Sequence, residues 1–149
     1  MKNKVNEIAI SYTGNIKTQL LPQITCSRSA AALAYSEWDK KTIGLQETFK
    51  IMLLNNANKV KGICVVSTGG ITGTLVDVRI LFAILLKSLT TAVILLHNHP
   101  SGTLRPSEAD KLLTQKIKKA GALFDIQVLD HLILTPDGDY YSFADNAIL

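Results

Sequence analysis

Two histidines and an aspartate in the middle of the chain have the residue types and spacing of a catalytic metal site. His97 and His99 are two positions apart at the end of AVILL, an apolar run that predicts a strand buried on both faces. Side chains alternate along a strand, so both imidazoles point to one side, with their Cα atoms roughly 7 Å apart. Imidazoles placed in this way can converge on one Zn²⁺ ion at about 2.1 Å.

The third candidate ligand is Asp110, in the first turn of a helix that we expect to begin near Ser107. Pro100 cannot continue a strand and Ser101-Gly102 permits a sharp turn, so the helix can begin beside the strand end. Three protein ligands with an open fourth position are what a catalytic zinc ion requires. On spacing alone, however, Ser-x-x-Asp is better interpreted as a helix capping box, and only the upstream histidines favour a ligand. Ser107 could both cap the helix and donate a hydrogen bond into the site.

A hydrolytic zinc site also needs a base that accepts a proton from water. Glu47 is the best candidate, because it begins the predicted strand ETFKIMLLN and shares a face with Phe49, Ile51 and Leu53. A carboxylate at the end of an apolar face is costly unless it is paired or functional. The alternative for Glu47 is a solvated strand end.

The composition predicts one ordered domain. The chain has 149 residues, of which 47% are hydrophobic, and a net charge of +4. Its cysteines, Cys26 and Cys64, are far apart and belong to no CxxC motif, which favours a reducing, cytoplasmic setting over a disulfide framework. No secretory signal is recognisable, and charges interrupt the most hydrophobic stretch, residues 75–96, so we expect no membrane span.

The hydrophobic periodicity predicts a single mixed α/β domain with the order β-α-β-β-α-β-α-β. Strands are expected at 5–14, 47–55, 60–69, 91–99 and 126–135, and helices at 29–41, 78–89 and 107–121, with a turn and a short YYSF tail after the last strand. The strands at 47–55 and 60–69 should form a hairpin. The last helix carries a cluster of lysines, which we interpret as a solvated face, with weak nucleic-acid binding as the alternative: Lys111, Lys116, Lys118 and Lys119.

These motifs together resemble a known family. One motif resembles the JAMM signature of the JAB/MPN metalloproteases: His97-x-His99, followed after seven residues by Ser107-x-x-Asp110. More narrowly, HNHPSG, PSEAD and LDHLIL resemble the RadC-type JAB domain of bacteria and their mobile elements. QETFKIMLLN, STGG and YYSFAD are also similar to that family, so the resemblance spans Ser27 to the C-terminus.

The resemblance implies a curved mixed sheet flanked by helices, in a cytidine-deaminase-like layout, over residues 27–149, preceded by an N-terminal strand and loop over 1–26. It implies zinc ligands at His97, His99 and Asp110, a general acid/base at Glu47, and at Ser107 a hydroxyl that stabilises the oxyanion. The implied activity is zinc-dependent hydrolysis of a peptide or isopeptide bond. The substrate would be a peptide or protein, with a ubiquitin-like modifier among the options, and the oligomeric state stays open.

Some features depart from the family pattern or leave alternatives open. Longer RadC-type proteins carry a helix-hairpin-helix region, for which residues 1–26 are too few, and this weakens a direct DNA-repair role. Val78-Arg79-Ile80 replaces a common Pro-Arg-Glu, which affects only a local role. His131, after Asp130, is either structural, which we favour, or a contact supporting the ligands.

Two other functions are alternatives to hydrolysis. The first is a DNA-repair or mobile-element accessory protein that binds nucleic acid or a protein partner and has a structural or vestigial metal site. The second, a nucleobase deaminase, requires Pro-Cys-x-x-Cys and His-x-Glu, neither of which occurs in the sequence.

Overall fold

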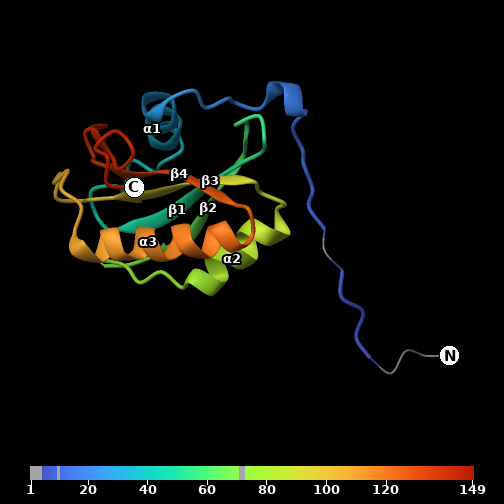
Figure 1. Ribbon diagram of the computed structural model, residues 1–149. Helices are drawn as coiled ribbons and strands as arrows, with labels where there is room; N and C mark the ends of the chain where they lie inside the picture. The colour runs from blue at the N-terminus through green and yellow to red at the C-terminus, as the bar shows by residue number, and fades with distance from the viewer. Residues whose placement is uncertain (1–4, 10, 71–72) are drawn as a thin grey trace.

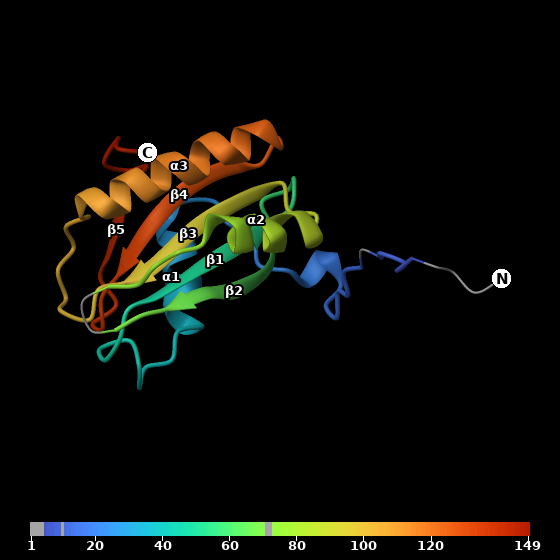
Figure 2. The same cartoon turned by 90° about the horizontal axis from the view of Figure 1, so that it is seen from below.

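Five strands form one mixed sheet in the order β2-β1-β3-β4-β5, as Figures 1 and 2 show. The computed structural model describes residues 5–9, 11–70 and 73–149. β1 is antiparallel to both β2 and β3, β3 is parallel to β4, and β5 closes the sheet antiparallel to β4. The bounds are β1 Thr48–Leu54, β2 Val60–Thr68, β3 Ala92–Asn98, β4 Gln127–Leu134 and β5 Tyr140–Ser142.

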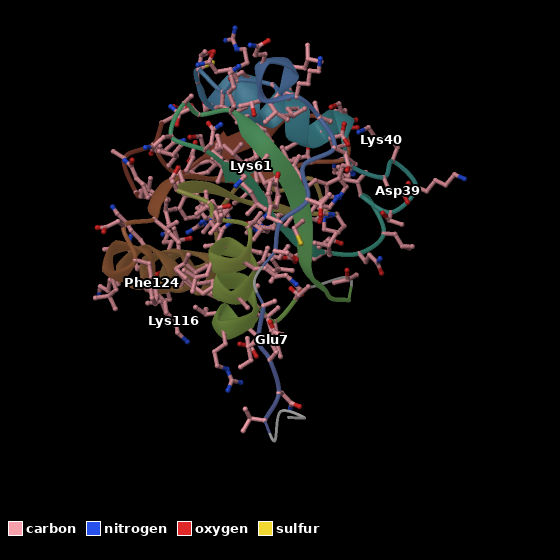
Figure 3. The ribbon with its side chains drawn as sticks, turned by 90° about the vertical axis from the view of Figure 1, so that its right-hand side faces the viewer. Glu7, Asp39, Lys40, Lys61, Lys116 and Phe124 are labelled. Atoms are coloured by element: carbon pink, nitrogen blue, oxygen red, sulfur yellow. The ribbon has the colours of Figure 1, made fainter. Side chains whose placement is uncertain are left out.

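Helices cover both faces of the sheet. α1 (Ser27–Ser36) lies on one face, and α2 (Val78–Lys87) and α3 (Glu108–Leu123) lie on the other (Figure 1). Figure 3 views these layers from the edge strand β2, with α1 above it and α2 below. The parallel pair β3–β4 is connected through α3, the usual crossover for parallel strands. The predicted mixed sheet flanked by helices is therefore confirmed.

β3 is the centre of the core, and all seven of its residues are buried. Val93 and Leu95 pack in the cluster under α2 and α3, whereas Ile94 and Leu96 pack in the cluster under α1. The strand is therefore apolar on both faces, as its continuous hydrophobic run predicted. By the same alternation, His97 lies on the α3 side and Asn98 on the α1 side.

The most hydrophobic stretch divides into α2 and β3, as predicted. Asp77 is the N-cap of α2, and its carboxylate accepts a hydrogen bond from the Arg79 backbone N–H at 2.9 Å. No helix in the described ranges has the length and apolar character to cross a membrane.

The predicted first strand over residues 5–14 is wrong for the residues that the structure describes. Residues 5–9 and 11–14 form no strand and are exposed, while residue 10 lies outside the described part. An alternating pattern stabilises a strand only when a partner strand and a buried face exist, and the sheet offers neither here. The N-terminal segment instead contains a short 3₁₀ helix, η1 (Thr18–Leu20), and a single bridge between Gln23 and Lys59.

Two of the predicted helices also have ends that differ from the structure. The helix expected over 29–41 is α1, which begins two residues earlier and ends at Ser36, because the chain then turns so that Trp38 is buried. α3 continues past Gly121 to Leu123. A Cβ atom at Gly121 would lie 2.6 Å from the carbonyl oxygen of Ile126, the residue before β4, so glycine permits a close approach of this backbone and does not end the helix.

Candidate metal centre

The register between β1 and β3 brings Glu47 to the histidines. Phe49 pairs with His97 across the two antiparallel strands, so the position two residues before Phe49 lies beside the position two residues after His97. Glu47 and His99 occupy those two positions. The sequence predicted that Glu47 shares a face with the apolar residues of β1, and this face is the one that packs under α2 and α3.

Four side chains from three elements converge on one point. Glu47, His97, His99 and Asp110 each offer a ligand atom, and these atoms all lie within 4.8 Å of one another. His97 Nε2 lies 2.9 Å from His99 Nε2 and 3.5 Å from Asp110 Oδ1. Glu47 Oε1 is 3.9 Å from His97 Nε2. The structure therefore brings together all three predicted ligands and the predicted base.

These distances fit a metal ion. Two atoms that each lie about 2.1 Å from a tetrahedral ion are about 3.4 Å apart. The two imidazole Nε2 atoms are 2.9 Å apart, and the Asp110 carboxylate lies 3.5 Å from His97 Nε2 through Oδ1 and 3.7 Å from His99 Nε2 through Oδ2. Two imidazoles and a carboxylate are also a donor set that first-row divalent ions such as zinc accept. The residues present therefore fit the group that the motif implies.

A tight turn orients His99. The Gly102 N–H donates to the His99 carbonyl at 3.0 Å, with Pro100 and Ser101 between them. Gly102 has φ +81°, a conformation that L side chains rarely adopt. The turn returns the Thr103 carbonyl to His99, where it accepts a hydrogen bond from Nδ1 at 2.6 Å. Since the proton of neutral His99 is held on Nδ1, its Nε2 lone pair faces the cluster.

Asp110 has both of the roles that the sequence left open. Its Oδ2 accepts the backbone N–H of Ser107 at 2.8 Å, and Ser107 Oγ accepts the backbone N–H of Asp110 at 3.0 Å, which completes a capping box. Its Oδ1 faces His97. Capping therefore positions the carboxylate as a ligand and does not compete with that role.

The charges in the cluster favour a bound cation. Burial alone would raise the pKa of Asp110, but His97, His99 and the Ser107 backbone N–H outweigh it and hold that pKa far below its usual range. Burial opposes charge on His99, yet the Asp110 carboxylate and the Thr103 carbonyl raise its pKa. A site that favours an ionised acid and a positive neighbour also favours a divalent ion.

His131 lies behind the ligands, against His97. It is fully buried in β4, and its Nε2 is 2.7 Å from His97 Nδ1. Burial holds the pKa of His131 well below its usual value, so this ring is neutral. The sequence favoured a plain structural role, but the structure places His131 in contact with a candidate ligand.

Asn98 is a site residue that sequence reasoning did not identify. Its side-chain amide donates to the Ile43 and Gln46 carbonyls at 2.7 and 2.9 Å, and its Oδ1 accepts the Thr48 N–H at 2.7 Å. Asn98 thus binds the backbone on both sides of Glu47. Its position between two ligands was visible in the sequence, but its partners lie about 50 residues earlier in the chain.

A cleft of about 650 Å³ opens onto the cluster. Glu47, His99, Ser107 and Asp110 line it, and His97 lies buried beneath, with 1% of its side chain exposed. The other lining residues are small or uncharged: Gly44, Gly73, Thr74, Pro100, Ser101, Thr103 and Ala109. Three candidate metal-site side chains and the predicted oxyanion donor are therefore accessible from one opening.

Comparison with known proteins agrees with this geometry. The RadC-like JAB domain family matches residues 24–148. The chain is 53% identical over 102 residues to a UPF0758 protein of Flavobacterium johnsoniae, covering 68% of this chain and 44% of that protein. It is 45% identical over 104 residues to a UPF0758 protein of Porphyromonas gingivalis, covering 70% and 46%. A UPF0758 protein of Aromatoleum aromaticum is 40% identical over 119 residues, or 78% and 53%.

The chain spans about half the length of these curated relatives. The matched region contains the five sheet strands, the three α-helices and all four residues of the cluster. The chain therefore belongs to the RadC-like JAB domain family.

Proposed function

We propose that this chain is a zinc-dependent hydrolase of peptide or isopeptide bonds. The observation that carries the proposal is the convergence of Glu47, His97, His99 and Asp110 at the floor of an open cleft. Two imidazoles and one carboxylate form the ligand set of a catalytic zinc site, and a second carboxylate beside them serves as the base.

His97, His99 and Asp110 would hold the ion. When bound, zinc supplies Lewis acidity toward water and toward the carbonyl oxygen of the substrate. The protein holds the three ligands close together, although they come from two different elements. The strand end supplies both imidazoles on one face, and the first turn of α3 supplies the carboxylate.

Glu47 is the proton carrier. Its carboxylate is 3.9 Å from His97 Nε2 and lines the cleft, with 13% of the side chain exposed. From this position it can accept a proton from the attacking water and deliver it to the leaving nitrogen. Asn98 holds the backbone around Glu47, which limits the freedom of the carboxylate.

Ser107 is the proposed donor to the oxyanion. Its Oγ already accepts the Asp110 backbone N–H, so the hydroxyl proton is free to point into the cleft that the residue lines. A donor already oriented toward developing negative charge lowers the barrier of acyl transfer.

The proposed substrate is a peptide or protein, which includes a ubiquitin-like modifier. Away from the cluster, the described residues that line the cleft carry no charged side chain. Such walls suit a main-chain amide with small neighbouring side chains. We propose the cytoplasm as the compartment, since both cysteines are free thiols.

The test combines metal content with hydrolysis of a fluorogenic peptide and isopeptide library. Wild-type protein is expected to hold one equivalent of zinc and to cleave a subset of the library. His97→Ala should lose the zinc, whereas Glu47→Gln should retain it and lose cleavage. Cleavage by Glu47→Gln at the wild-type rate, or wild-type protein that takes up no zinc, would refute the mechanism.

A nucleic-acid accessory role ranks lower. Two of the four lysines on α3 already have partners within the chain: Lys111 pairs with Glu108 at 2.9 Å, and Lys118 Nζ donates to the Leu149 carbonyl at 3.1 Å. Salt-dependent DNA binding that persists after chelation would favour this alternative.

A further inference from the structure

A hydrogen-bond chain connects two of the candidate ligands from behind. His97 Nδ1 lies 2.7 Å from His131 Nε2, and His131 Nδ1 lies 2.6 Å from Thr114 Oγ1. Thr114 Oγ1 in turn donates to the backbone carbonyl of Asp110 at 2.6 Å. The hydrogen-bond chain therefore begins at His97 of β3, passes through His131 of β4 and ends at the helix turn of α3 that carries Asp110.

The last bond determines the direction of all the others. Two oxygens 2.6 Å apart need a proton between them, and a carbonyl oxygen only accepts, so the single hydroxyl proton of Thr114 points at Asp110. Thr114 must then accept from His131 Nδ1–H. A neutral His131 has its lone pair on Nε2, so it accepts from His97 Nδ1–H.

These hydrogen bonds also determine the protonation of the other ring nitrogen of His97, Nε2. With its proton held on Nδ1, neutral His97 presents the Nε2 lone pair to the cluster, 2.9 Å from the Nε2 of His99. A metal ligand must present a lone pair, and the opposite tautomer would aim an N–H at the metal position.

We propose that His131 and Thr114 are positioning residues that hold His97 in its metal-binding tautomer and tie its ring to the turn carrying Asp110. This inference rests on the metal site of the proposed function. It adds a role for two residues that stand outside the ligand set.

The surroundings hold the residues of this hydrogen-bond chain in place. His131 and Thr114 are both fully buried. The His131 ring stacks on Phe143 with centroids 4.5 Å apart and meets the Phe49 ring edge-on at 5.7 Å. Because burial leaves no room for water to replace a lost partner, removing the Thr114 hydroxyl leaves the Nδ1–H of His131 without an acceptor. His131 is then no longer held in the tautomer that accepts from His97.

The sequence shows why Thr114 is suited to this role. It is four residues after Asp110, so one helical turn places its hydroxyl against the Asp110 carbonyl. Valine has nearly the same shape as threonine and lacks only the hydroxyl, whereas serine keeps the hydroxyl and lacks the methyl group. Thr114→Val therefore removes two hydrogen bonds from the series, and Thr114→Ser preserves them.

The experiment measures Zn²⁺ affinity by competition with a chromogenic chelator and records the absorption spectrum of the Co²⁺-loaded protein, so no substrate is required. Thr114→Val is expected to weaken Zn²⁺ binding about 10- to 100-fold, as loss of contacts behind a ligand does in other zinc proteins, and to change the Co²⁺ spectrum. Thr114→Ser should restore both to nearly wild-type values.

The matched control is Thr90→Val. Thr90 is also buried, and its hydroxyl bonds to Ser88 at the end of α2, away from the cluster. It should lower thermal stability while leaving Zn²⁺ affinity unchanged, which separates loss of a buried hydroxyl from loss of positioning. His131→Gln is the second variant, because its amide oxygen can accept from His97 Nδ1 and should bind Zn²⁺ more tightly than His131→Leu.

Two results would overturn the inference while leaving the proposed function intact: wild-type Zn²⁺ affinity in Thr114→Val, or equal impairment in Thr114→Val and Thr114→Ser. Wild-type protein that binds neither ion would overturn the metal site itself and this inference with it.

Discussion

The starts of α1 and α3 have the same local architecture and different uses. At α1 the N-cap is Cys26, and the Ser29 hydroxyl accepts the Cys26 N–H at 3.2 Å. At α3 the N-cap is Ser107, and the Asp110 carboxylate accepts the Ser107 N–H at 2.8 Å. Both are capping boxes, and each satisfies backbone donors that a helix start leaves unpaired.

The difference lies in what surrounds the third helical residue. Ser29 is near the surface and bonds only with Thr25 and Cys26 of its own segment. Asp110 has a second carboxylate oxygen, which lies 3.5 Å from His97 Nε2. A capping box thus holds a side chain still, and neighbours from elsewhere in the chain decide whether it also becomes part of a site.

The strongest test of this comparison replaces Asp110, the third residue of α3, with serine, the residue at the same position of α1. Asp110→Ser should keep the capping box and the fold, because the new hydroxyl can still accept the Ser107 N–H. Zn²⁺ affinity should fall by at least about 100-fold, since a charged ligand is lost. Competition with a chromogenic chelator measures this change. The reciprocal Ser29→Asp should create no Zn²⁺ binding, and Zn²⁺ binding retained by Asp110→Ser would show that Asp110 only caps.

The next prediction separates the two roles of Ser107. Glycine is tolerated at an N-cap and costs only a few tenths of a kcal/mol, so Ser107→Gly should leave the melting temperature nearly unchanged. Loss of the hydroxyl should lower kcat about 100-fold if it stabilises the oxyanion. Zn²⁺ content should stay at the wild-type level. Unchanged turnover of a cleaved library peptide would restrict Ser107 to capping.

A smaller effect is expected at the capping box of α1, which contributes to stability only. Ser29→Ala removes the acceptor of the Cys26 N–H and should cost about 0.5–1 kcal/mol of unfolding free energy. Urea denaturation would measure this loss. Zn²⁺ affinity should not change, and a drop in affinity would mean that the start of α1 is coupled to the site.

The smallest effect concerns the start of α2, where Asp77 caps without a capping-box partner. The side chain and backbone N–H of Arg79 hold the pKa of Asp77 below its ordinary value. A lowered carboxyl pKa contributes stability that is present above about pH 4 and is lost as the pH falls through the folded-state pKa. The stability difference between wild type and Asp77→Asn should therefore shrink on acidification below about pH 4. Thermal melts from pH 2 to 7 would detect this, and a difference independent of pH would contradict it.

Much of this protein could be predicted from local patterns. The positions of β1 to β4, α2 and α3 follow from apolar runs, periodicity and capping residues, because each element buries a face that its own residues define. The short strand β5 was expected only as a tail, because it becomes a strand by pairing with β4. His97 and His99 could be placed on one side of a strand for the same reason. The first expected strand was wrong because an alternating pattern does not reveal whether a partner strand exists.

Other features required the folded chain. The sequence could rank Glu47 above the other acids, but only the β1–β3 register puts it beside His99. Asn98 binds backbone groups about 50 residues earlier in the chain, and His131 contacts a ligand 34 residues before it. No local pattern contains such partners.

The sequence alone determined the kinds of groups at the site, the face of β3 that carries the imidazoles, and the acid three residues after a helix cap. These follow from bonded geometry, which repeats every two residues in a strand and every 3.6 in a helix. Only the tertiary structure decided that Asp110 both caps and faces His97, and which way the proton of His97 points. Those outcomes depend on atoms 2.6 to 3.5 Å apart that belong to different elements, and packing of the whole sheet sets those distances.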